Sequence, residues 1–278
     1  MHYPVKILRL SLLGAAAFSV GIAQATTLTY PDFSNTNGLM LNGNAAQVGN
    51  VLRVTPAING QAGSIFSTNA ISLASNVSFS TAFQFRFTNP NGFDGQGVGA
   101  DGLVFIVQTN ANNVGGGGGG IGYDGVLNSV GIEFDTWDNG AGDGNSSNHV
   151  GINVGGNVNS LVRAEVTTNN MNNGAIWYSW VDYNGVTDLL EVFLSEINVR
   201  PSLATLSLTR DLIGDLGTTN AFVGFSSGTG SANANHDVLS WTFVDTFAPI
   251  NGVPEPASLA LIGLGLAGLS FVRRRKIV

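Results

Sequence analysis

The sequence predicts an all-β protein, an antiparallel β-sandwich of the jelly-roll type, on three observations. Short apolar runs alternate with polar residues, the segments between them are rich in Gly, Asn, Ser and Thr, and helical periodicity over a long stretch is absent. Phe79, Phe83, Phe85 and Phe87 illustrate the alternation, because a period of two places residues on one buried face of a strand. Many short strands in one body of this length favour a sandwich.

Nine segments have this strand pattern. They are Leu52–Val54, Val77–Phe87, Gly102–Gln108, Val130–Asp135, His149–Val154, Ala175–Tyr183, Leu189–Leu194, Ala221–Ser226 and Val238–Val244. Asn89-Pro90-Asn91-Gly92 and Tyr183-Asn184-Gly185 are turn signals, and the second predicts a hairpin. A short helix is predicted at Leu212–Leu216, and the run of glycines Gly115–Gly120 is predicted to be a loop.

Residues 1–25 have the pattern of a signal peptide. Lys6 and Arg9 precede the apolar run Leu10–Ala23, and Ala23-Gln24-Ala25 is a small-x-small cleavage site. We therefore expect export across the inner membrane with cleavage after Ala25.

The C-terminal residues 251–278 predict a second targeting segment. Residues 257–272 are apolar or small, enough for a transient membrane helix of roughly 24 Å, and Arg273–Lys276 would stay cytoplasmic. The preceding Pro254-Glu255-Pro256 resembles the PEP-CTERM sorting signal of Gram-negative bacteria that make exopolysaccharide. This resemblance implies processing by an exosortase and a final location at the cell surface, in the outer membrane or in the extracellular matrix.

The body between these segments, residues 26–250, is acidic. Removing both ends takes away six of the 11 basic residues but one of the 18 acidic ones, which leaves a net charge of −12 and no lysine. Such a surface repels nucleic acid and anionic lipid. The chain has no cysteine, so an exported domain must be held by its core and by metal instead of disulfides.

The stretch from Glu133 to His149 concentrates metal-ligating side chains in a chain that is only 10% charged: Glu133, Asp135, Asp138, Asn139, Asp143 and His149. Crowded carboxylates repel one another unless protons or cations intervene. A strand over Glu133–Trp137 would place Glu133, Asp135 and Trp137 on one face. Oxygen ligands suit calcium, and carboxylates with His149 suit manganese or another transition metal. The pattern predicts two adjacent metals that share Asp135 and Asp143.

Val130–Ile152 also resembles the fingerprint of the L-type (legume) lectins, whose fold is the concanavalin A-like lectin/glucanase sandwich. The matching elements are Val130, Glu133-Phe134-Asp135-Thr136-Trp137, Asn139, a loop aspartate and His149-Val150-Gly151-Ile152. The resemblance implies a transition-metal site from Glu133, Asp135, Asp143 and His149. It also implies a calcium held by Asp135, the carbonyl of Trp137, Asn139 and Asp143. Because the loop from Asn139 to His149 does not have the length usual in the family, Asp138 could take the place of Asp143.

Three further stretches carry the resemblance. Gly99–Phe105 is similar to the strand in which an aspartate follows a cis peptide and accepts hydrogen bonds from sugar hydroxyls, here Ala100-Asp101. The glycine run supplies Gly119 as the residue whose amide meets the sugar. Val223–Ser226 and His236–Phe243 resemble the closing strands, with a specificity loop over Ser227–Asn235. The implied carbohydrate site is Asp101, Gly119, Trp137 and Asn139, with Trp137 or a neighbour stacking on the sugar.

The sequence therefore predicts a secreted or cell-surface, metal-dependent lectin that binds glycans non-covalently, is associated with exopolysaccharide or biofilm matrix, and is not an enzyme. The resemblance also allows a homodimer through a flat back sheet. A glycoside hydrolase is the alternative, since Glu133 and Asp138 imitate the paired acids of glucanases on this fold. A structural matrix or adhesion protein without sugar binding is a third possibility. His236, Trp177, Tyr178 and Trp180 are interpreted as structural residues.

Overall fold

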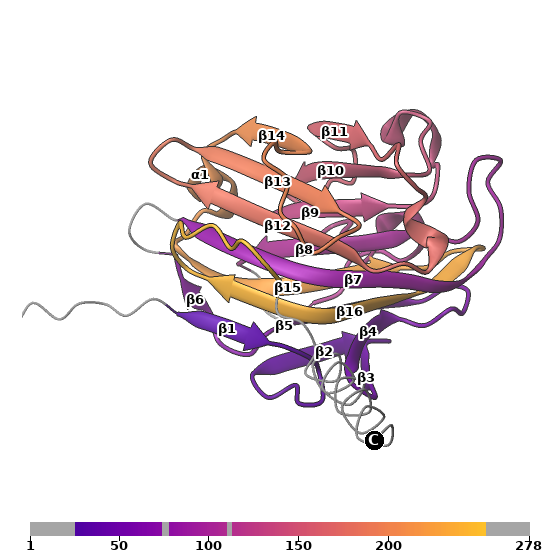
Figure 1. Cartoon of the computed structure of the whole chain (residues 1–278), viewed down its shortest axis with the longest axis horizontal. Helices are drawn as coiled ribbons and strands as arrows, with labels where there is room; N and C mark the ends of the chain where they lie inside the picture. Colours follow the sequence, from indigo (N-terminus) through magenta and orange to yellow (C-terminus); the bar gives the residue numbers. More distant parts are fainter. Residues whose placement is uncertain (1–25, 74–77, 110–112, 254–278) are drawn as a thin grey trace, which may run out of the picture.

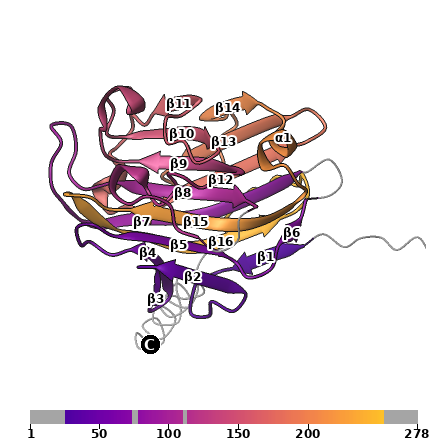
Figure 2. The ribbon, with the colours of Figure 1, turned by 180° about the vertical axis from the view of Figure 1, so that it is seen from behind.

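Two antiparallel sheets packed face to face form the computed structural model, which describes residues 26–73, 78–109 and 113–253 (Figure 1). The back sheet has the order β14 (Leu206–Thr209), β13 (Leu189–Ser195), β12 (Trp177–Asn184), β7 (Phe79–Asn91), β16 (Asn233–Val244), β4 (Val51–Thr55) and β3 (Ala46–Val48), and β1 (Thr27–Tyr30) also pairs with β16. The front sheet has the order β11 (Val162–Glu165), β10 (His149–Val154), β9 (Ser129–Asp135), β8 (Gly102–Gln108), β15 (Asn220–Gly228), β5 (Ala62–Ser67) and β2 (Leu39–Gly43), with β6 (Ile71–Ser72) beside β15. Figure 2 shows the same sandwich from behind.

The core between the sheets is largely aromatic. The four alternating phenylalanines of β7 are all buried, as their period of two predicts. The ring of Phe83 lies 5.9 Å from that of Phe105, 5.7 Å from that of Phe134 and 5.0 Å from that of Phe225, measured between centroids. Since each fully buried phenylalanine contributes about 1.5–3 kcal/mol, this contact between β7 and the front sheet is a main source of stability.

All nine predicted strands are present, and several bounds are confirmed to the residue. Gly102–Gln108 is β8, His149–Val154 is β10, and Leu212–Leu216 is the α-helix α1. Asp211 caps this helix by accepting hydrogen bonds from the amides of Ile213 and Gly214. The Tyr183-Asn184-Gly185 signal also holds, because β12 ends at Asn184 and pairs with β13.

Two turn assignments were wrong. The strand β7 continues through Asn89-Pro90-Asn91, and the chain leaves it only at Gly92, whose φ is +91°. The predicted loop Ser227–Asn235 is also too long: β15 extends to Gly228 and β16 begins at Asn233. Polar residues there extend the pairing of β15 with β5 and β8 and the pairing of β16 with β7, because hydrogen bonds between backbones do not depend on apolar side chains.

Seven of the strands in the described residues were not predicted: β1, β2, β3, β5, β6, β11 and β14. Each has between two and six residues, and several lie at sheet edges, where a strand has one partner only. Such short segments rich in small and polar residues show no clear alternation. Their pairing is decided by the neighbouring strand instead of their own pattern.

After β16 the chain crosses the outer face of the back sheet as a C-terminal strap, Ala248–Val253. The amide of Ala248 donates to Ser80 Oγ at 3.0 Å. Val253 and the Asn198 side chain exchange two hydrogen bonds, each of 2.9 Å. The side chain of Val253 is buried in a cluster with Ala82, Trp180 and Phe193. A homodimer through this face would therefore have to accommodate the strap.

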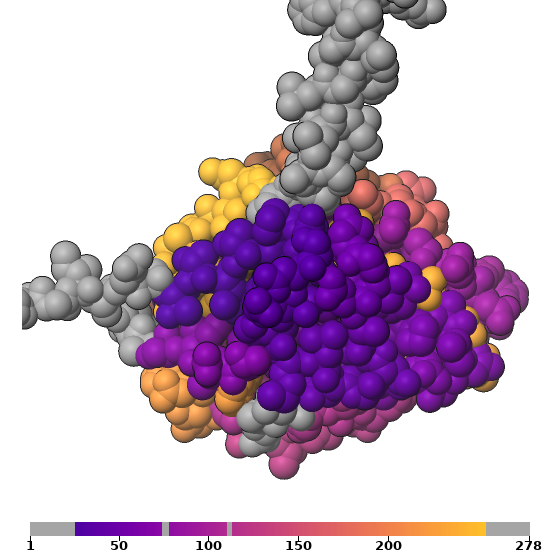
Figure 3. All heavy atoms as spheres, turned by 90° about the horizontal axis from the view of Figure 1, so that it is seen from below, coloured from indigo at the N-terminus to yellow at the C-terminus, as the bar shows by residue number. Residues whose placement is uncertain are grey.

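The predicted targeting segments lie outside the described residues, namely the signal peptide 1–25, the sorting triplet at 254–256 and the membrane helix 257–272. In the part of the chain that the structure describes, no helix is long and apolar enough to cross a membrane. Seen from below, the N-terminal strands cover the lower side of the sandwich (Figure 3).

We predict that Asn198→Ala releases the strap. The variant loses both hydrogen bonds to Val253, so the amide of Val253 should exchange with solvent at least about tenfold faster, as judged by hydrogen-exchange mass spectrometry. Asn157→Ala is the control, because within the described residues the Asn157 side chain bonds only the amide of Asn159, in its own turn. Unchanged exchange in Asn198→Ala would show that Val253 is held by its apolar contacts alone.

Candidate functional site

The register of the front sheet gathers the predicted ligands at one end of three strands. Asp135 at the end of β9 lies opposite Gly102 of β8 and opposite His149 of β10. Because side chains alternate along β9, Glu133 and Asp135 share the outer face while Phe134 enters the core. The strand pattern therefore places two carboxylates beside the imidazole of His149.

The side chains of Asp135, Asp143 and His149 form a compact, buried group whose candidate ligand atoms all lie within 4.8 Å of one another. His149 Nε2 is 3.3 Å from Glu133 Oε1. Asn153 Nδ2 donates to Glu133 Oε2 at 2.5 Å, and the Ser160 hydroxyl donates to Oε1. Hydrogen bonds from Asn153 and Ser160 thus fix the carboxylate of Glu133 next to His149.

The loop after β9 gives the two loop aspartates different contacts. It contains the 3₁₀ turn η2 (Gly140–Asp143), and Asp143 Oδ2 accepts the amide hydrogen of Asn139 at 2.6 Å. Asp138 instead accepts from the amide of Gly140 at 2.6 Å and from Gln96 Nε2 at 3.0 Å. The structure places Asp143 in the cluster with Asp135, whereas Asp138 contacts its own loop and the loop between β7 and β8.

Burial raises the pKa values of Asp135 and Asp143. Burial is the main cause for Asp135, whose pKa is well above its ordinary value, and Glu133 and Asp143 add repulsion. Burial also raises the pKa of Asp143. The ion pairs of the described residues join Arg53, Arg200 and Arg210 to other acids, and His149 contacts Glu133 within this site. Carboxylates and an imidazole with unbalanced charge form a suitable donor set for divalent cations.

Asp101 precedes β8 and lies beside the acidic cluster. It follows a cis peptide bond with Ala100, as the family resemblance implied. Its carbonyl accepts the amide hydrogen of Thr136 at 2.8 Å, and its own amide donates to the carbonyl of Gly228 at 3.1 Å. The side chain is 3% exposed, and burial, with repulsion from Asp143, raises its pKa to about 7. Among the described residues Asp101 Oδ2 has no hydrogen-bond partner.

Glycines bring two further loops against Asp101. The glycine run contains the turn η1 (Gly118–Gly120), and a Cβ atom on Gly119 would lie 2.5 Å from Asn139 Oδ1. A Cβ atom on Gly230, in the β15–β16 turn, would lie 3.4 Å from the Cα of Gly118 and 3.6 Å from Asp101 Oδ2. Gly119, Asn139 and Asp101 thus converge. Trp137 follows β9 and is half-buried, and its backbone amide donates a hydrogen bond to Asp135 Oδ1 at 2.7 Å.

Three residues of the site were not predicted from the sequence, namely Asn153, Ser160 and Gly230. Asn153 shares a face of β10 with His149, so its position could have been inferred from the strand period. Ser160 and Gly230 lie in connections whose residue types give no such signal. The residues interpreted as structural fit that role: Trp177 and Trp180 are buried, Tyr178 packs on Trp180, and buried His236 bonds Thr55 Oγ1 at 2.8 Å with a pKa lowered to about 3 by burial.

The paired acids of a glycosidase are not arranged for hydrolysis. A retaining enzyme needs two carboxyl groups facing one bond, one of them as proton donor. Glu133 is 1% exposed and committed to Asn153 and Ser160, while Asp138 bonds Gly140 and Gln96. The Glu133/Asp138 alternative therefore lacks an accessible pair.

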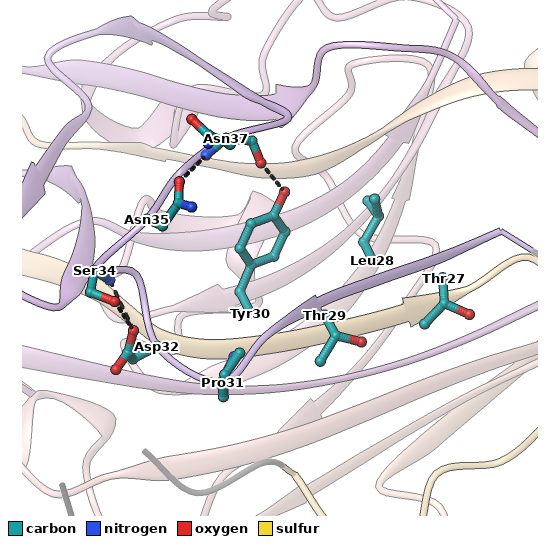
Figure 4. A pocket seen from close by; sticks show the side chains of 9 residues that line it. All are labelled: Thr27, Leu28, Thr29, Tyr30, Pro31, Asp32, Ser34, Asn35 and Asn37. Carbon is teal, nitrogen blue, oxygen red and sulfur yellow. Dashed lines mark hydrogen bonds between the residues drawn. The ribbon is translucent and has the colours of Figure 1, made fainter. Parts of the chain in front are cut away.

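An open hollow of about 450 Å³ lies at the opposite end of the sandwich, along β1 and the loop that follows it, from Thr27 to Asn37 (Figure 4). The register places Thr27 against Val244, whereas Asn233 at the other end of β16 lies opposite Asn91 near the acidic cluster. Polar groups that line the hollow bond one another, as in the 2.9 Å hydrogen bond from the Tyr30 hydroxyl to the carbonyl of Asn37. Its lining contains a single carboxylate, Asp32, and no histidine, so it does not resemble the cluster around Asp135.

Comparison with known proteins gives one consistent family. A model of the legume lectin domain matches residues 25–256, and a model of the PEP-CTERM protein-sorting motif matches residues 252–276. The L-type lectin-domain containing receptor kinase VIII.1 of Arabidopsis thaliana is 33% identical over 264 residues, which cover 91% of this chain but 33% of the kinase. Favin of Vicia faba is 32% identical over 174 residues, 60% of this chain and 70% of favin.

Solved structures agree with the fold. The lectin from Bauhinia forficata in complex with GalNAc has a TM-score of 0.68 at 22% identity, covering 80% of this chain and 98% of that one. Basic winged bean lectin with Tn-antigen has a TM-score of 0.66 at 27% identity, with coverage of 80% and 98%. The Bauhinia structure supports the fold alone.

We predict that the protein stripped of metal by chelation is less stable at pH 8 than at pH 5. Between about pH 4 and pH 7 folded Asp101 retains a proton that the unfolded chain has released, so the free energy of unfolding falls as pH rises through this range and levels off above it. A shift of about three units corresponds to a loss of roughly 4 kcal/mol over the whole range, of which roughly 2.5 kcal/mol falls between pH 5 and pH 8, and Asp135 and Asp143 act in the same direction. Urea unfolding of wild type and Asp101→Asn at both pH values measures this effect. Equal pH dependence in the two proteins would contradict it.

Proposed function

Because the chain belongs to the legume lectin family, we propose that its carbohydrate-binding site is the surface where Asp101, Gly119 and Asn139 converge. The observation that carries this proposal is the convergence itself: an acceptor, a backbone amide and a side-chain amide from three separate loops meet above buried acids. The legume lectin domain matches most of the chain, and both solved structures compared above are lectins. This chain accordingly acts by binding and not by catalysis.

The polar groups at this surface suit sugar hydroxyls. Asp101 Oδ2 needs a donor, which a hydroxyl supplies, and the amide hydrogen of Gly119 and the side chain of Asn139 complete a set of donors and acceptors. The buried carboxylate makes a charge-assisted hydrogen bond, which is stronger than a neutral one. Trp137 or a neighbouring side chain would stack against the apolar face of the sugar.

Metals complete the proposal. Calcium would be held by Asp135, the carbonyl of Trp137, Asn139 and Asp143, and manganese or another transition metal by Glu133, Asp135, Asp143 and His149. The buried acids with raised pKa values and the unpartnered Nδ1 of His149 within the described residues support a site that balances its charge with cations. When bound, these ions would fix the loop between β9 and β10 before the glycan arrives, a preorganisation that lowers the entropy cost of binding.

The sorting motif at 252–276 implies export to the surface or outside of a Gram-negative bacterium. We propose further that the signal peptide directs export and that residues 257–272 hold the protein briefly in the inner membrane. An exosortase then processes the C-terminus, and the protein associates with exopolysaccharide. The acidic body favours a neutral polysaccharide, because an anionic one would be repelled.

A glycan array with the purified full chain, with calcium and manganese or with EDTA, tests this function. We expect binding that EDTA abolishes and that Asp101→Asn weakens by about 10- to 100-fold, since a charged acceptor is replaced by a donor. Asp245→Asn, at the far end of the sandwich, is the matched control. An array that is silent with both metals present would favour a structural matrix protein, and binding that survives EDTA would refute metal dependence.

The two loop aspartates should differ in metal binding. Asp143→Ala removes a member of the buried cluster and should lower calcium and manganese affinity by more than about 100-fold. Asp138→Ala disturbs only contacts within the neighbouring loops and should lower it by less than about tenfold. Isothermal titration calorimetry of the two variants decides between them. The reverse order would assign the ligand role to Asp138.

A further inference from the structure

A second hollow, of about 300 Å³, lies beside the proposed glycan site. It is enclosed by the loop between β7 and β8 and by the segment before β12 that contains the 3₁₀ turn η3 (Met171–Asn173). All the side chains that line it are uncharged, and they include Phe93, Val98, Asn170 and Asn172. Both segments lie at the right-hand end of the sandwich in Figure 1.

One wall of the hollow is an exposed aromatic ring. Phe93 is 67% exposed and is bridged to Val98, which is 46% exposed. Most phenylalanines of the described residues are buried in the core, so this one stands apart. An exposed apolar surface next to polar groups is typical of a binding site, since leaving it in water has a free-energy cost.

The other wall contains a buried amide without a partner. Asn172 is 6% exposed, and within the described residues neither its Nδ2 nor its Oδ1 makes a hydrogen bond. It packs on Gly99, where a Cβ atom would lie 3.0 Å from Asn172 Nδ2. A primary amide offers two donor hydrogens and an acceptor, and leaving them unsatisfied costs about 1–3 kcal/mol each. A ligand with neighbouring hydroxyl groups would satisfy both atoms.

Hydrogen bonds connect the loop that lines the hollow to the loops around Asp101. The Asp94 carboxylate accepts the amide hydrogen of Asp138 at 3.0 Å. Gln96 Nε2 donates to Asp138 Oδ2 at 3.0 Å and to the carbonyl of Asn145 at 2.9 Å. The loop that carries Phe93 therefore rests on the loop that carries Asn139, and Gly99 leads directly into Ala100-Asp101.

We propose that this hollow is a second saccharide subsite, in which the ring of Phe93 covers the apolar face of a pyranose and the amide of Asn172 bonds its hydroxyls. The site would then bind a stretch of a neutral oligosaccharide instead of a single sugar. A neutral glycan is the occupant because the lining offers an aromatic ring and amides but no charge, and because glycan binding next to it is already proposed. The proposal rests on that function at Asp101.

The test compares ligands of different length. Galactose, N-acetylgalactosamine, glucose and mannose, and neutral tetrasaccharides ending in each, are titrated into the full chain with calcium and manganese present. We expect a tetrasaccharide to bind more tightly than its terminal monosaccharide. Phe93→Ala should weaken the tetrasaccharide about tenfold and the monosaccharide less than about twofold. Phe93→Trp should retain the gain with length.

Phe247→Ala is the matched control, because Phe247 is a phenylalanine that is 44% exposed and follows the opposite end of β16. Thermal unfolding confirms that the variants fold, which the exposure of Phe93 leads us to expect. A gain with length that survives in Phe93→Ala, or no gain in the wild type, would overturn the subsite while leaving monosaccharide binding intact. Equal loss for both ligands would show that Phe93 acts only through the loop at Asp138. Absence of all binding would instead refute the proposed function at Asp101.

Discussion

The concentration of buried negative charge at one end of the front sheet is the constraint on which the site loops depend. Like charges a few ångströms apart repel strongly where water is excluded. Asp101, Glu133, Asp135 and Asp143 are all at least 94% buried there, and the pairing of β9 with β8 and β10 fixes the positions of Glu133 and Asp135. The hydrogen bonds that partly compensate this charge come from the loop backbone, notably the amides of Trp137 and Asn139. The groups that stabilise the carboxylates therefore also determine the shape of the surface that a glycan would meet.

The close approach of backbones supports the same surface from the other side. A Cβ atom on Gly228 would lie 2.8 Å from the carbonyl oxygen of Gly118, so the glycine run packs directly against the end of β15. Gly118 has a φ of +58°, a conformation that glycine adopts without strain. Below this contact a buried network joins Thr55 Oγ1 to Ser227 Oγ at 2.8 Å and Ser227 Oγ to the carbonyl of Gly102 at 2.6 Å. The glycine run is thus a packed element of the site and not a linker.

The parts that could be predicted from sequence are those determined by local pattern. The period of two along β7 and β9 was sufficient to place Phe83 in the core and to place Glu133 beside Asp135, because alternation is a property of the strand itself. Contacts between loops could not be predicted in this way. That Asp138 turns toward Gln96 while Asp143 turns toward Asp135 depends on the conformation of η2, and the residue types alone allow either arrangement. The same limit applies to Asn172 and Phe93, which are distant in sequence and meet only through the packing of η3 against β7.

The proposed glycan site and the strap that leads to the sorting motif lie on different sheets. Asp101, Asp135 and His149 belong to the front sheet or its loops, whereas the strap bonds Ser80 of the back sheet and Asn198 of the β13–β14 connection. Strand β16 joins these regions, since it begins at Asn233 close to the site and ends at Val244, from which the chain returns across the back sheet. It lies between β7 and β4 as an inner strand of the back sheet, and the strap that follows it is bonded to Ser80 of this sheet. Attachment through the residues that follow Val253 would therefore leave the loops at Asp101 free to face a glycan.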